Sequence, residues 1–343
     1  MITFAIVGLG RIGKRHAAII QGNPDCNLVA VCDIDSAQTE YAQTELNVPF
    51  YPDFTQLLAN TQGVDVICIC TPNGLHAQQA RIALAHKHHV VIEKPMALSK
   101  EECEAVIFHA LQHSRYVFCV MQNRYSPPSV WLKSLLEENR LGKIRMVQAN
   151  CYWNRDERYY DQNPWRGTLA LDGGPLFTQF SHFVDLLYWL FGDITHIKAN
   201  FANFAHQQNT EFEDTGSISF QFVKGGLGVF NYSTAVWKQN FESSITLIGE
   251  RGTVKVGGQY MESLVHCDIL DYDAPTLPPS NPPNNYGRYK GSAANHHYIF
   301  ENVVQTLNGK STITTNALEG LKVVDIIERI YQLRPEFRPS PLS

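Results

Sequence analysis

Lys94 is the residue whose surroundings most clearly suit chemistry. The run Val90-Val91-Ile92 is apolar and β-branched, which is typical of a buried parallel strand, and Glu93, Lys94 and Pro95 follow it directly. In an open parallel sheet, ligands bind beyond the carboxyl ends of the strands, so we expect the Lys94 amine to project into the crevice where a cofactor meets a substrate. Pro95 cannot continue the strand, and the sequence does not decide whether the bond before it is cis or trans.

A glycine-rich motif, Gly8-Leu9-Gly10-Arg11-Ile12-Gly13, closes the first apolar strand and opens a helix. In such a motif the first glycine permits a tight turn, the second lets the backbone approach a pyrophosphate, and the third lets the helix pack on the strand. We expect the pyrophosphate at the helix N-terminus, where free N–H groups favour an anion. The same glycines could form a turn that holds no ligand.

Asp33 favours the dinucleotide interpretation of this motif. It stands 20 residues after Gly13, at the end of the second predicted strand, where an acid can bond a ribose diol. Its negative charge would repel a 2′-phosphate, which favours NAD over NADP.

Two further loops are expected to flank the nicotinamide. Thr71-Pro72-Asn73 ends the fourth predicted strand, as Glu93-Lys94-Pro95 ends the fifth. Asn73 and His76 are equally suited to ordinary turn and helix-cap chemistry, and that alternative stays open here. The residues expected to contact the cofactor are Gly8, Gly10, Arg11, Ile12, Gly13, Asp33, Thr71, Pro72, Asn73, His76, Glu93, Lys94 and Gln122.

His182 is the second candidate for proton transfer, on a helix predicted from about Pro175 to Phe191. Thr178 and Gln179 lie four and three residues before it, so the three side chains are expected to share one helix face. A lone helix histidine is often only packed. Here the double glycine directly upstream allows a close backbone approach, which favours a functional role.

Composition excludes several classes of protein. The 343 residues are 44% hydrophobic, which suits about two globular domains with real cores. The net charge of -5 comes from interspersed residues without a basic stripe, so neither nucleic acid nor an anionic membrane is an expected partner. The apolar start lacks the basic region of a signal peptide, and no apolar run reaches the roughly 18 to 20 residues of a membrane helix. We expect a cytoplasmic protein.

The cysteines and clustered histidines do not indicate a metal site. Eight cysteines are scattered without a CxxC pair, which favours free buried thiols in a reducing compartment. His86, His88 and His89 straddle a predicted helix end and strand start, so their side chains should point in different directions. No metal is expected.

The order of predicted elements separates two domains. Residues 1–122 alternate short apolar strands with helices, the last helix opening on a capping box at Ser99, and this alternation predicts an α/β Rossmann domain with a doubly wound parallel sheet. Residues 123–343 contain longer extended runs joined by glycine turns, which predicts an α+β domain with a large, mainly antiparallel sheet. One face of that sheet is free to dimerise. Pro275 to Ser292 is expected to be a long loop, and Leu333 to Ser343 a tail.

The glycine motif, Thr71-Pro72-Asn73, Glu93-Lys94-Pro95 and a histidine helix after a double glycine together resemble the glucose-fructose oxidoreductase and inositol dehydrogenase (Gfo/Idh/MocA) family. The resemblance covers nearly the whole chain. It implies nicotinamide-dependent oxidation or reduction of a sugar-like alcohol, with Lys94 and His182 as the catalytic pair. Many members carry an aspartate four residues before the histidine, whereas this chain has Thr178, so an Asp-His pair cannot be assumed.

Within that family, the segments 159–168, 172–174 and 290–297 resemble UDP-N-acetyl-2-amino-2-deoxyglucuronate dehydrogenases. Those enzymes oxidise the C3 hydroxyl of a nucleotide sugar during synthesis of bacterial surface polysaccharide (O-antigen). Guanidinium, ammonium, amide and hydroxyl groups in these segments suit a diphosphate, a uronate and sugar hydroxyls. The residues expected to line the substrate site are Lys94, Arg124, Tyr152, Asn154, Trp165, Arg166, Thr178, Gln179, His182, Lys290, Ser292 and Asn295.

Such a substrate carries three negative charges, so local cations must outweigh the negative charge of the chain. The candidates are Arg124, Arg155, Arg158, Arg166, Arg288 and Lys290. A 2-oxo acid that reoxidises NADH and a homo-oligomer, dimeric or tetrameric through the C-terminal sheet, are further expectations. Two alternatives remain: a dehydrogenase of a free polyol or aldose, and a non-catalytic NAD-binding sensor.

Overall fold

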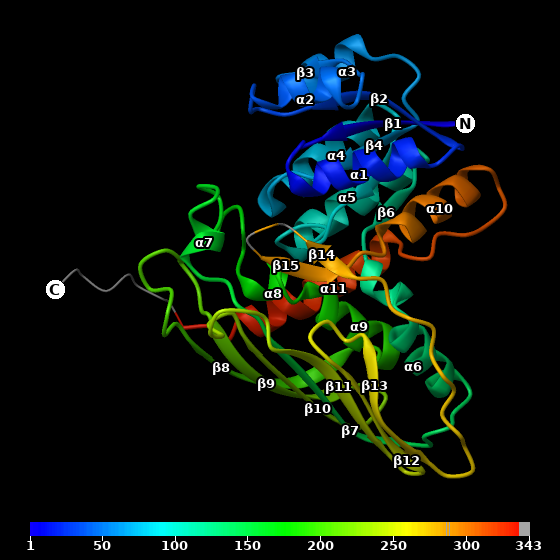
Figure 1. Cartoon of the computed structure of the whole chain (residues 1–343), viewed down its shortest axis with the longest axis vertical. Coiled ribbons are helices and arrows are strands. Elements are labelled where there is room, and N and C mark those ends of the chain that lie inside the picture. Colours follow the sequence, from blue (N-terminus) through cyan, green and yellow to red (C-terminus); the bar gives the residue numbers. More distant parts are fainter. Residues whose placement is uncertain (286, 288, 336–343) are drawn as a thin grey trace. The chain divides into compact units, whose positions relative to one another are not determined.

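The computed structural model describes residues 1–285, 287 and 289–335, and the chain divides into two compact units (Figure 1). The first unit comprises Met1–Met121 and His296–Val324, and the second comprises Gln122–Asn295 and the chain from Asp325 onward. The sequence predicted a single boundary at residue 122. In the structure the chain leaves the first unit after Met121, so Gln122 belongs to the second unit, and residues 296–324, which we expected in the C-terminal domain, belong to the first unit.

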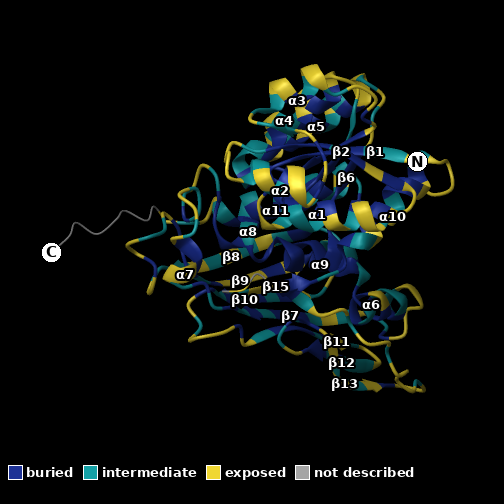
Figure 2. Ribbon diagram, turned by 45° about the horizontal axis from the view of Figure 1, so that its top comes forward, coloured by how far each residue is buried: buried dark blue, intermediate teal, exposed yellow. Residues whose placement is uncertain are grey.

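The first unit is built on a six-stranded parallel sheet, as the sequence predicted. Its strands are β1 (Ile2–Val7), β2 (Cys26–Cys32), β3 (Phe50–Tyr51), β4 (Val66–Ile69), β5 (His89–Ile92) and β6 (Val117–Cys119), in the order β3-β2-β1-β4-β5-β6. The order reverses between β1 and β4, so right-handed crossovers place the helices that follow these two strands on opposite faces. In Figure 2 the central strands of this sheet are mostly dark blue, because apolar side chains bury both faces, whereas the edge strand β3 is only partly buried.

The helices of the first unit begin where their sequence signals place them. They are α1 (Arg11–Gly22), α2 (Gln38–Thr44), α3 (Phe54–Asn60), α4 (His76–Ala85), α5 (Lys100–Gln112) and α10 (His296–Leu307), with a 3₁₀ turn at Asn73–Leu75. The predicted cap of α5 is confirmed, since the Ser99 side chain accepts from the Glu102 N–H at 3.2 Å. Helix α10 packs against α1.

Hydrogen bonds to β6 explain why residues 296–324 join the first unit. The Cys119 N–H donates to the Thr315 carbonyl at 2.9 Å, and the Thr315 hydroxyl donates to the Cys119 carbonyl at 2.7 Å. The chain therefore returns to the edge of the parallel sheet after residues 122–295 of the second unit. This return depends on residues far apart in sequence, and no local pattern announces it.

The second unit contains a seven-stranded sheet in the order β13-β12-β11-β7-β10-β9-β8. Its strands are β7 (Ile144–Tyr152), β8 (Ile194–Ala202), β9 (Thr215–Phe222), β10 (Leu227–Ser233), β11 (Glu242–Gly249), β12 (Gly252–Gly257) and β13 (Ser263–Ile269). Neighbouring strands are antiparallel except β7 and β10, which run parallel. The α+β class predicted from the sequence is confirmed.

One face of this sheet carries the core of the second unit. Strand β9 alternates buried and exposed residues, and Phe180 packs on Phe230 and Tyr232 of β10 at ring distances of 6.5 and 5.2 Å. The helices are α6 (Pro127–Glu137), α7 (Glu157–Tyr160), α8 (Pro175–Thr178), α9 (Ser181–Phe191) and α11 (Ala317–Tyr331), the last crossing the boundary between units. Within the described ranges, no helix is long and apolar enough to cross a membrane.

Two predictions about the second unit are wrong. The expected helix from Pro175 to Phe191 is broken into α8 and α9, because the Phe180 N–H bonds the Pro175 carbonyl five residues back and the regular ladder stops there. The expected loop from Pro275 to Ser292 contains the hairpin β14 (Pro283–Asn285) and β15 (Lys290–Ala293), and β13 precedes it. Proline and asparagine conceal these strands because they are poor strand formers. Residues 336–343 of the predicted tail lie outside the described residues.

Candidate functional site

The glycine motif forms a close turn between β1 and α1. Gly8 has φ 92°, and a Cβ on it would lie 2.7 Å from the Cys70 carbonyl carbon at the end of β4. A Cβ on Gly13 would lie 1.9 Å from the Gly8 carbonyl oxygen. Gly10, by contrast, has open space around its Cβ position. The first and third glycines therefore fix the packing, while the second leaves room for a ligand.

The N-terminus of α1 suits an anion. Its N-cap is Gly10, which makes no side-chain cap, and no acidic residue lies in the first turn. The helix begins at Arg11, and backbone N–H groups in a first helical turn point toward the helix end, where an anion can accept them. The residues present fit a dinucleotide pyrophosphate, which the helix dipole and these N–H groups would hold.

Asp33 lies at the end of β2, beside the glycine turn. Its Oδ2 accepts from the Leu9 N–H at 2.6 Å, and its Oδ1 accepts from the Asp35 N–H at 2.8 Å. These bonds hold the half-buried carboxylate in one orientation. The position agrees with the predicted ribose contact, and the carboxylate keeps lone pairs for a diol.

His76 links the two loops expected beside the nicotinamide. Its Nδ1 lies 2.7 Å from the Pro95 carbonyl oxygen and its Nε2 lies 2.8 Å from the Thr71 carbonyl oxygen. Burial lowers the pKa of His76. The imidazole therefore joins the ends of β4 and β5, with Pro72 and the buried Asn73 between them. The contacts described for His76 are with backbone carbonyls, and its contact with the cofactor stays a prediction.

Glu93 is buried at the end of β5, directly before Lys94. Its Oε1 lies 2.9 Å from Nε2 of His16 and 3.7 Å from Nε2 of His296. Burial raises the pKa of Glu93, but the hydrogen bond and charge of His16, with His296 and Lys94, outweigh it and lower the value to about 2. These three residues are close enough to hold a cation, their ligand atoms lying within 4.8 Å of one another. Glu93 thus contacts neighbouring helices as well as the backbone of Lys94, whose N–H it accepts at 3.2 Å.

In the second unit, His182 belongs to a buried polar cluster. Its Nε2 lies 3.2 Å from Oγ of Ser292 and 3.4 Å from Nε2 of Gln122, and Gln122 donates to Ser292 at 3.1 Å. The three side chains are 5% exposed or less. Gln122 was predicted as a cofactor contact, and here it is a neighbour of the proposed catalytic histidine.

Thr178 and Gln179 are separated from His182 by the break between α8 and α9. The Thr178 hydroxyl contacts the Asp172 carbonyl at 3.0 Å and also the Asp172 carboxylate. Gln179 donates to the Tyr159 hydroxyl at 2.9 Å. The single helix is therefore not present, and the common face of these three side chains stays a prediction.

A guanidinium surrounded by aromatic rings is the most distinctive feature of the second unit. Arg155 is 3% exposed, and its guanidinium carbon lies 4.9 to 5.3 Å from the ring centres of Trp153, Tyr159 and Tyr289. Among the described residues, its hydrogen-bond acceptors are neutral oxygens, of Asn154, Asn240 and Lys290, and its Nε has no hydrogen-bond partner there. Burial lowers the pKa of Arg155, which reflects the cost of holding this charge without a carboxylate.

Arg166 extends the same arrangement. Its guanidinium carbon stands 3.9 Å from the ring centre of Tyr159 and 5.5 Å from that of Trp165, and it donates to the Tyr289 hydroxyl at 3.1 Å. In the described part of the chain, neither Arg155 nor Arg166 forms an ion pair with an acid. The two cations are therefore available to an anionic ligand.

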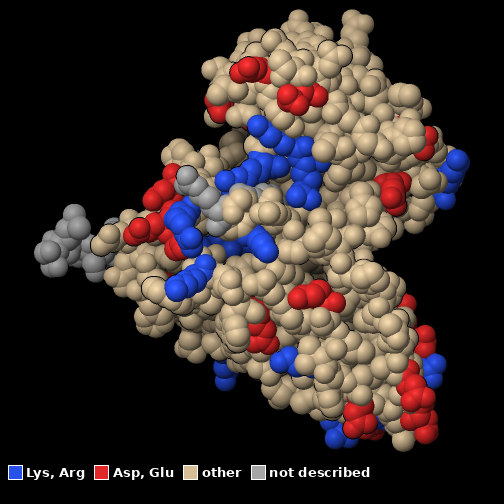
Figure 3. All heavy atoms as spheres, in the orientation of Figure 1, with Lys and Arg blue, Asp and Glu red and all other residues tan. Residues whose placement is uncertain are grey.

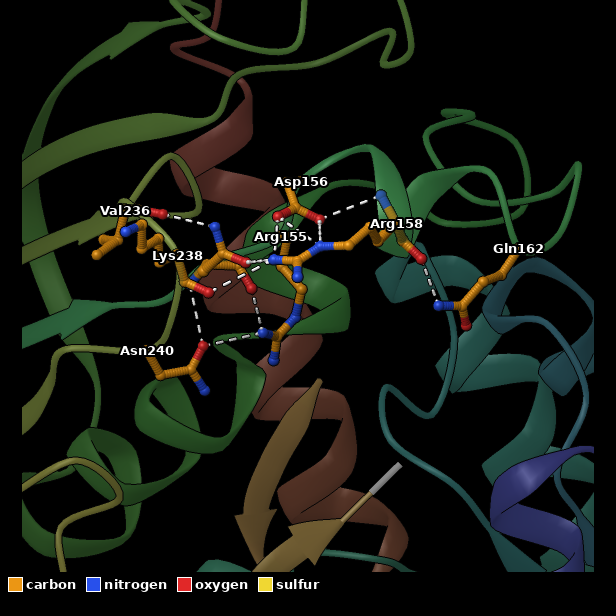
Figure 4. Close-up of polar contacts among 8 residues, drawn as sticks. Arg155, Asp156, Arg158, Gln162, Val236, Lys238 and Asn240 are labelled. Carbon is orange, nitrogen blue, oxygen red and sulfur yellow. Dashed lines mark hydrogen bonds and ion pairs between the residues drawn. The ribbon is translucent and has the colours of Figure 1, made fainter. Parts of the chain in front are cut away.

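Two other predicted cations are already neutralised. Arg124 makes a buried bidentate pair with Asp185, with N–O distances of 2.6 to 3.1 Å. Arg158 is exposed and paired with Asp156 (Figure 4). On the face drawn in Figure 3, Lys and Arg side chains gather in the region of α7, the helix that carries Arg158. Arg288 lies outside the described residues.

Three further predicted substrate residues already form hydrogen bonds within the second unit. Asn154 donates to the Val236 carbonyl at 2.6 Å, in the region drawn in Figure 4. Tyr152 donates to Asn150 at 3.3 Å. Asn295, 1% exposed, bridges Ser126 and Asn281 at 3.0 and 2.7 Å.

A cavity of about 250 Å³ lies beside Lys290. Its walls include Ser126, Tyr260, Glu262, Asn281, Lys290 and Ala293. Ligand pockets commonly measure about 300 to 1,000 Å³, so this cavity has room for part of a nucleotide sugar.

Sequence reasoning missed His16, His296 and Asn240 as members of these clusters. His16 lies three residues after Gly13 on the buried face of α1, a spacing that predicts burial but not a partner. Asn240 reaches Arg155 at 3.1 Å and Tyr260 at 3.3 Å from a loop between β10 and β11. No local pattern singles out an asparagine in a loop.

Comparison with known proteins identifies the family. Residues 2–120 match the oxidoreductase family profile with the NAD-binding Rossmann fold, and residues 130–255 match the Gfo/Idh/MocA C-terminal domain. The chain belongs to the Gfo/Idh/MocA oxidoreductase family. It is accordingly an NAD-dependent oxidoreductase, as the sequence predicted.

Two solved structures resemble the chain over nearly its whole length. The WlbA dehydrogenase of Chromobacterium violaceum, in complex with NADH and UDP-GlcNAcA, is 34% identical with a TM-score of 0.86, over 97% of this chain and 93% of its own. The WlbA dehydrogenase of Bordetella pertussis, with the same ligands, is 32% identical with a TM-score of 0.87, over 100% and 99%. An inositol 2-dehydrogenase/D-chiro-inositol 3-dehydrogenase of Halalkalibacterium halodurans is 24% identical over 73% of this chain and 70% of its own.

Proposed function

We propose that this enzyme oxidises the C3 hydroxyl of a UDP-linked N-acetylglucosaminuronic acid to the 3-keto sugar, in the synthesis of a bacterial surface polysaccharide precursor. The observation that carries the proposal is Arg155, a buried guanidinium that pairs with no described carboxylate and is surrounded by aromatic rings. A buried charge of this kind is stabilised by an anionic ligand. The similarity to two dehydrogenases that bind UDP-GlcNAcA supports the same choice.

The charges of the substrate suit this cluster. A UDP-linked uronic acid brings two charges on the diphosphate and one on the uronate. Arg155 and Arg166 supply two cations that form no ion pair with a described carboxylate, although the charge of Asp172 acts on Arg166, and Lys290 is exposed beside the cavity. Planar guanidinium groups bind phosphate and carboxylate in a bidentate manner, which fixes orientation as well as charge.

Lys94 and His182 are proposed to share the proton transfer. NAD, when bound, supplies the hydride acceptor. The protein must then take the proton of the C3 hydroxyl, and an amine and an imidazole are the side chains suited to that near neutral pH. The hydroxyl of Ser292, 3.2 Å from Nε2 of His182, would orient the imidazole.

The proposal also includes a cytoplasmic location and a homo-oligomer. Every cysteine is a free thiol, and seven of the eight are buried, which suits a reducing compartment. The outer face of the second sheet exposes Leu227, Ile248 and Val265, apolar residues that a second copy could cover. A 2-oxo acid as a second substrate would reoxidise NADH.

Mass spectrometry of the reaction product tests the proposed function. Purified enzyme, NAD and the UDP-linked uronic acid are mixed with and without a 2-oxo acid, and the product should be two daltons lighter than the substrate. UDP-N-acetylglucosamine, which lacks the carboxylate, is the matched control and should react much more slowly. No reaction with the uronate in either mixture, together with efficient oxidation of free inositol or glucose, would replace this proposal by the polyol alternative.

That alternative rests on the similarity to inositol dehydrogenases. It explains the fold and the amine–imidazole pair equally well. It leaves Arg155 and Arg166 without a purpose, because a small neutral sugar has no charge for them to bind.

A further inference from the structure

We propose that the buried trio His16, Glu93 and His296 is a positioning device for Lys94, in which Glu93 holds the lysine backbone and its negative charge favours the ammonium form of the side chain. The inference rests on the proposed role of Lys94 in proton transfer. All three residues and Lys94 belong to the first unit. Glu93 was also predicted as a cofactor contact, whereas His16 and His296 were not.

The hydrogen bonds define a directed chain. Burial raises the pKa of the Cys70 thiol well above its ordinary value, so the thiol keeps its proton and can donate to Nδ1 of His16 at 3.3 Å. The opposite nitrogen, Nε2, then carries the imidazole proton and donates to Glu93 Oε1 at 2.9 Å. The second carboxylate oxygen accepts the Lys94 N–H at 3.2 Å. The chain therefore runs from β4 through α1 to the end of β5.

Glu93 stays charged although it is only 6% exposed. Its pKa of about 2 requires favourable neighbours, and the charged or titratable groups that face it are His16, His296, Lys94, His76, Cys68 and Cys70. His296 is neutral at ordinary pH, because burial lowers its pKa to about 3. Cys68 and Cys70 remain protonated for the same reason of burial. Lys94 follows Glu93 directly in the chain, and its charge is one of the causes, after His16 and His296, that lower the pKa of Glu93, so the two groups interact electrostatically.

A carboxylate in this place has two consequences for catalysis. It fixes the peptide from which the amine extends, and misplacing a catalytic group by about 1 Å can cost a hundredfold in rate. It also stabilises the ammonium form, which sets the pH at which the amine becomes able to accept a proton. If Glu93 and His16 had only a structural role, they would fix the Lys94 peptide without changing the pH at which the Lys94 amine loses its proton.

The trio itself suits a hydrogen-bond network better than a metal. His16 already uses both ring nitrogens, toward Cys70 and Glu93, and its ring packs edge-on against Phe300 at 5.0 Å. A bound cation would have to displace the proton between His16 and Glu93. Elemental analysis distinguishes the two cases.

The test measures the titration of Lys94 without any substrate. Lysines are reductively methylated with ¹³C-formaldehyde, and the dimethyl-Lys94 signal is assigned by its loss in Lys94→Arg and followed by NMR against pH. In Glu93→Gln the midpoint should move to lower pH by about 1, because the ammonium loses its attractive neighbour. Glu102→Gln, which removes a carboxylate of the α5 cap in the same unit, is the matched control and should leave the midpoint in place.

Two variants of His16 keep the test decisive if Glu93→Gln does not fold. His16→Phe removes the donor and should shift the midpoint in the same direction, whereas His16→Gln keeps an amide donor and should restore most of the original value. An unchanged midpoint in folded, NADH-binding Glu93→Gln or His16→Phe would overturn the proposal. One metal ion per chain, lost in His16→Gln, would overturn it too.

Kinetics separate this inference from the proposed function. With an active substrate, Glu93→Gln should lower the plateau kcat about tenfold while the limb of the pH profile that reports Lys94 moves to lower pH. If the UDP-linked uronic acid does not react but the Lys94 midpoint shifts as expected, the proposed substrate fails and the positioning role stands. If the UDP-linked uronic acid reacts but the Lys94 midpoint does not move, the proposed substrate stands and the positioning role of Glu93 fails.

Discussion

In the first unit, the glycine turn, Asp33 and the loops after β4 and β5 all lie at carboxyl ends of neighbouring parallel strands, whereas in the second unit His182 meets residues from distant segments. Its partners, Gln122 and Ser292, stand 60 and 110 residues away in sequence. The parallel sheet brings its site together by topology alone. In the second unit, His182 comes from α9, Gln122 from a 3₁₀ helix at Gln122–Tyr125 and Ser292 from β15. Because these elements are distant in sequence, we expect the chemistry of this cluster to be more sensitive to changes in packing.

The largest expected effect comes from removing one proton-handling group from each unit. Lys94→Ala and His182→Asn should each lower kcat by about a hundredfold or more, since positioned acid–base groups contribute about 10² to 10⁴. Binding of NADH, measured by fluorescence, should stay nearly unchanged in both. His196→Asn, at an exposed position with φ 51° that asparagine tolerates, is the control for the second unit. Near-normal turnover in either variant would remove that residue from the mechanism.

The next effect concerns the two arginines of one segment, which differ in burial and pairing. Arg155→Met should raise the KM for the UDP-linked uronic acid about thirtyfold, the result of losing about 2 kcal/mol from a buried charged contact. Arg158→Met should change it little, because Arg158 is exposed and already paired with Asp156.

This comparison requires evidence that the Arg155 variant still folds. Arg155 also bonds the Asn154 and Lys290 carbonyls, so thermal melting and NADH binding must show that Arg155→Met remains intact. Arg155→Lys keeps the charge without the planar fork and should fall between the two. Equal KM values for Arg155→Met and Arg158→Met would mean that the buried guanidinium does not bind the substrate.

A smaller effect is expected at the ribose end of the first unit. Asp33→Ser should improve the ratio of NADP to NAD usage about tenfold, by removing a like-charge contact of roughly 1 to 2 kcal/mol. Affinity for NAD should fall somewhat as well, because the Leu9 N–H loses its 2.6 Å carboxylate partner. Ratios of kcat/KM for the two cofactors provide the measurement. An unmodified enzyme that prefers NADP would contradict the assignment of Asp33.

The sequence predicted the first unit almost completely and the second only in outline. Strand and helix periodicity, the capping box at Ser99 and the glycine motif are local signals, and the sheet order follows from them through general rules of chain topology. The return of Thr315 to β6 and the pairing of His16 with Glu93 are long-range contacts without a local signal. In the second unit, the helix from Pro175 was predicted without its break because the apolar pattern runs on past Phe180.

The lack of a local signal for long-range contacts also explains why some predicted site residues have partners that the sequence did not indicate. Arg124 was chosen as a free cation from its charge, but Asp185 on α9 neutralises it, a contact 61 residues apart. Gln122 was predicted as a cofactor contact, and the structure places its side chain 3.4 Å from Nε2 of His182. Residue type predicts what a side chain can do, while its partners are set by packing of segments that the sequence does not place together.

The smallest effect is expected at Thr178, the position where many relatives carry an aspartate. Its hydroxyl contacts the carbonyl and carboxylate of Asp172, and the other carboxylate oxygen of Asp172 accepts the Gly167 N–H at 2.9 Å. Thr178 therefore stabilises the loop before α8 and lies beyond the helix break from His182. Thr178→Val should lower stability by about 1 kcal/mol, the usual loss for one hydrogen bond, and change kcat less than threefold. Thermal melting and steady-state kinetics measure the two effects separately, with Thr178→Ser as the control that keeps the hydroxyl. A hundredfold fall in kcat for Thr178→Val, with full activity in Thr178→Ser, would instead place this hydroxyl in the proton path of His182 and remove the difference drawn here between loop support and chemistry.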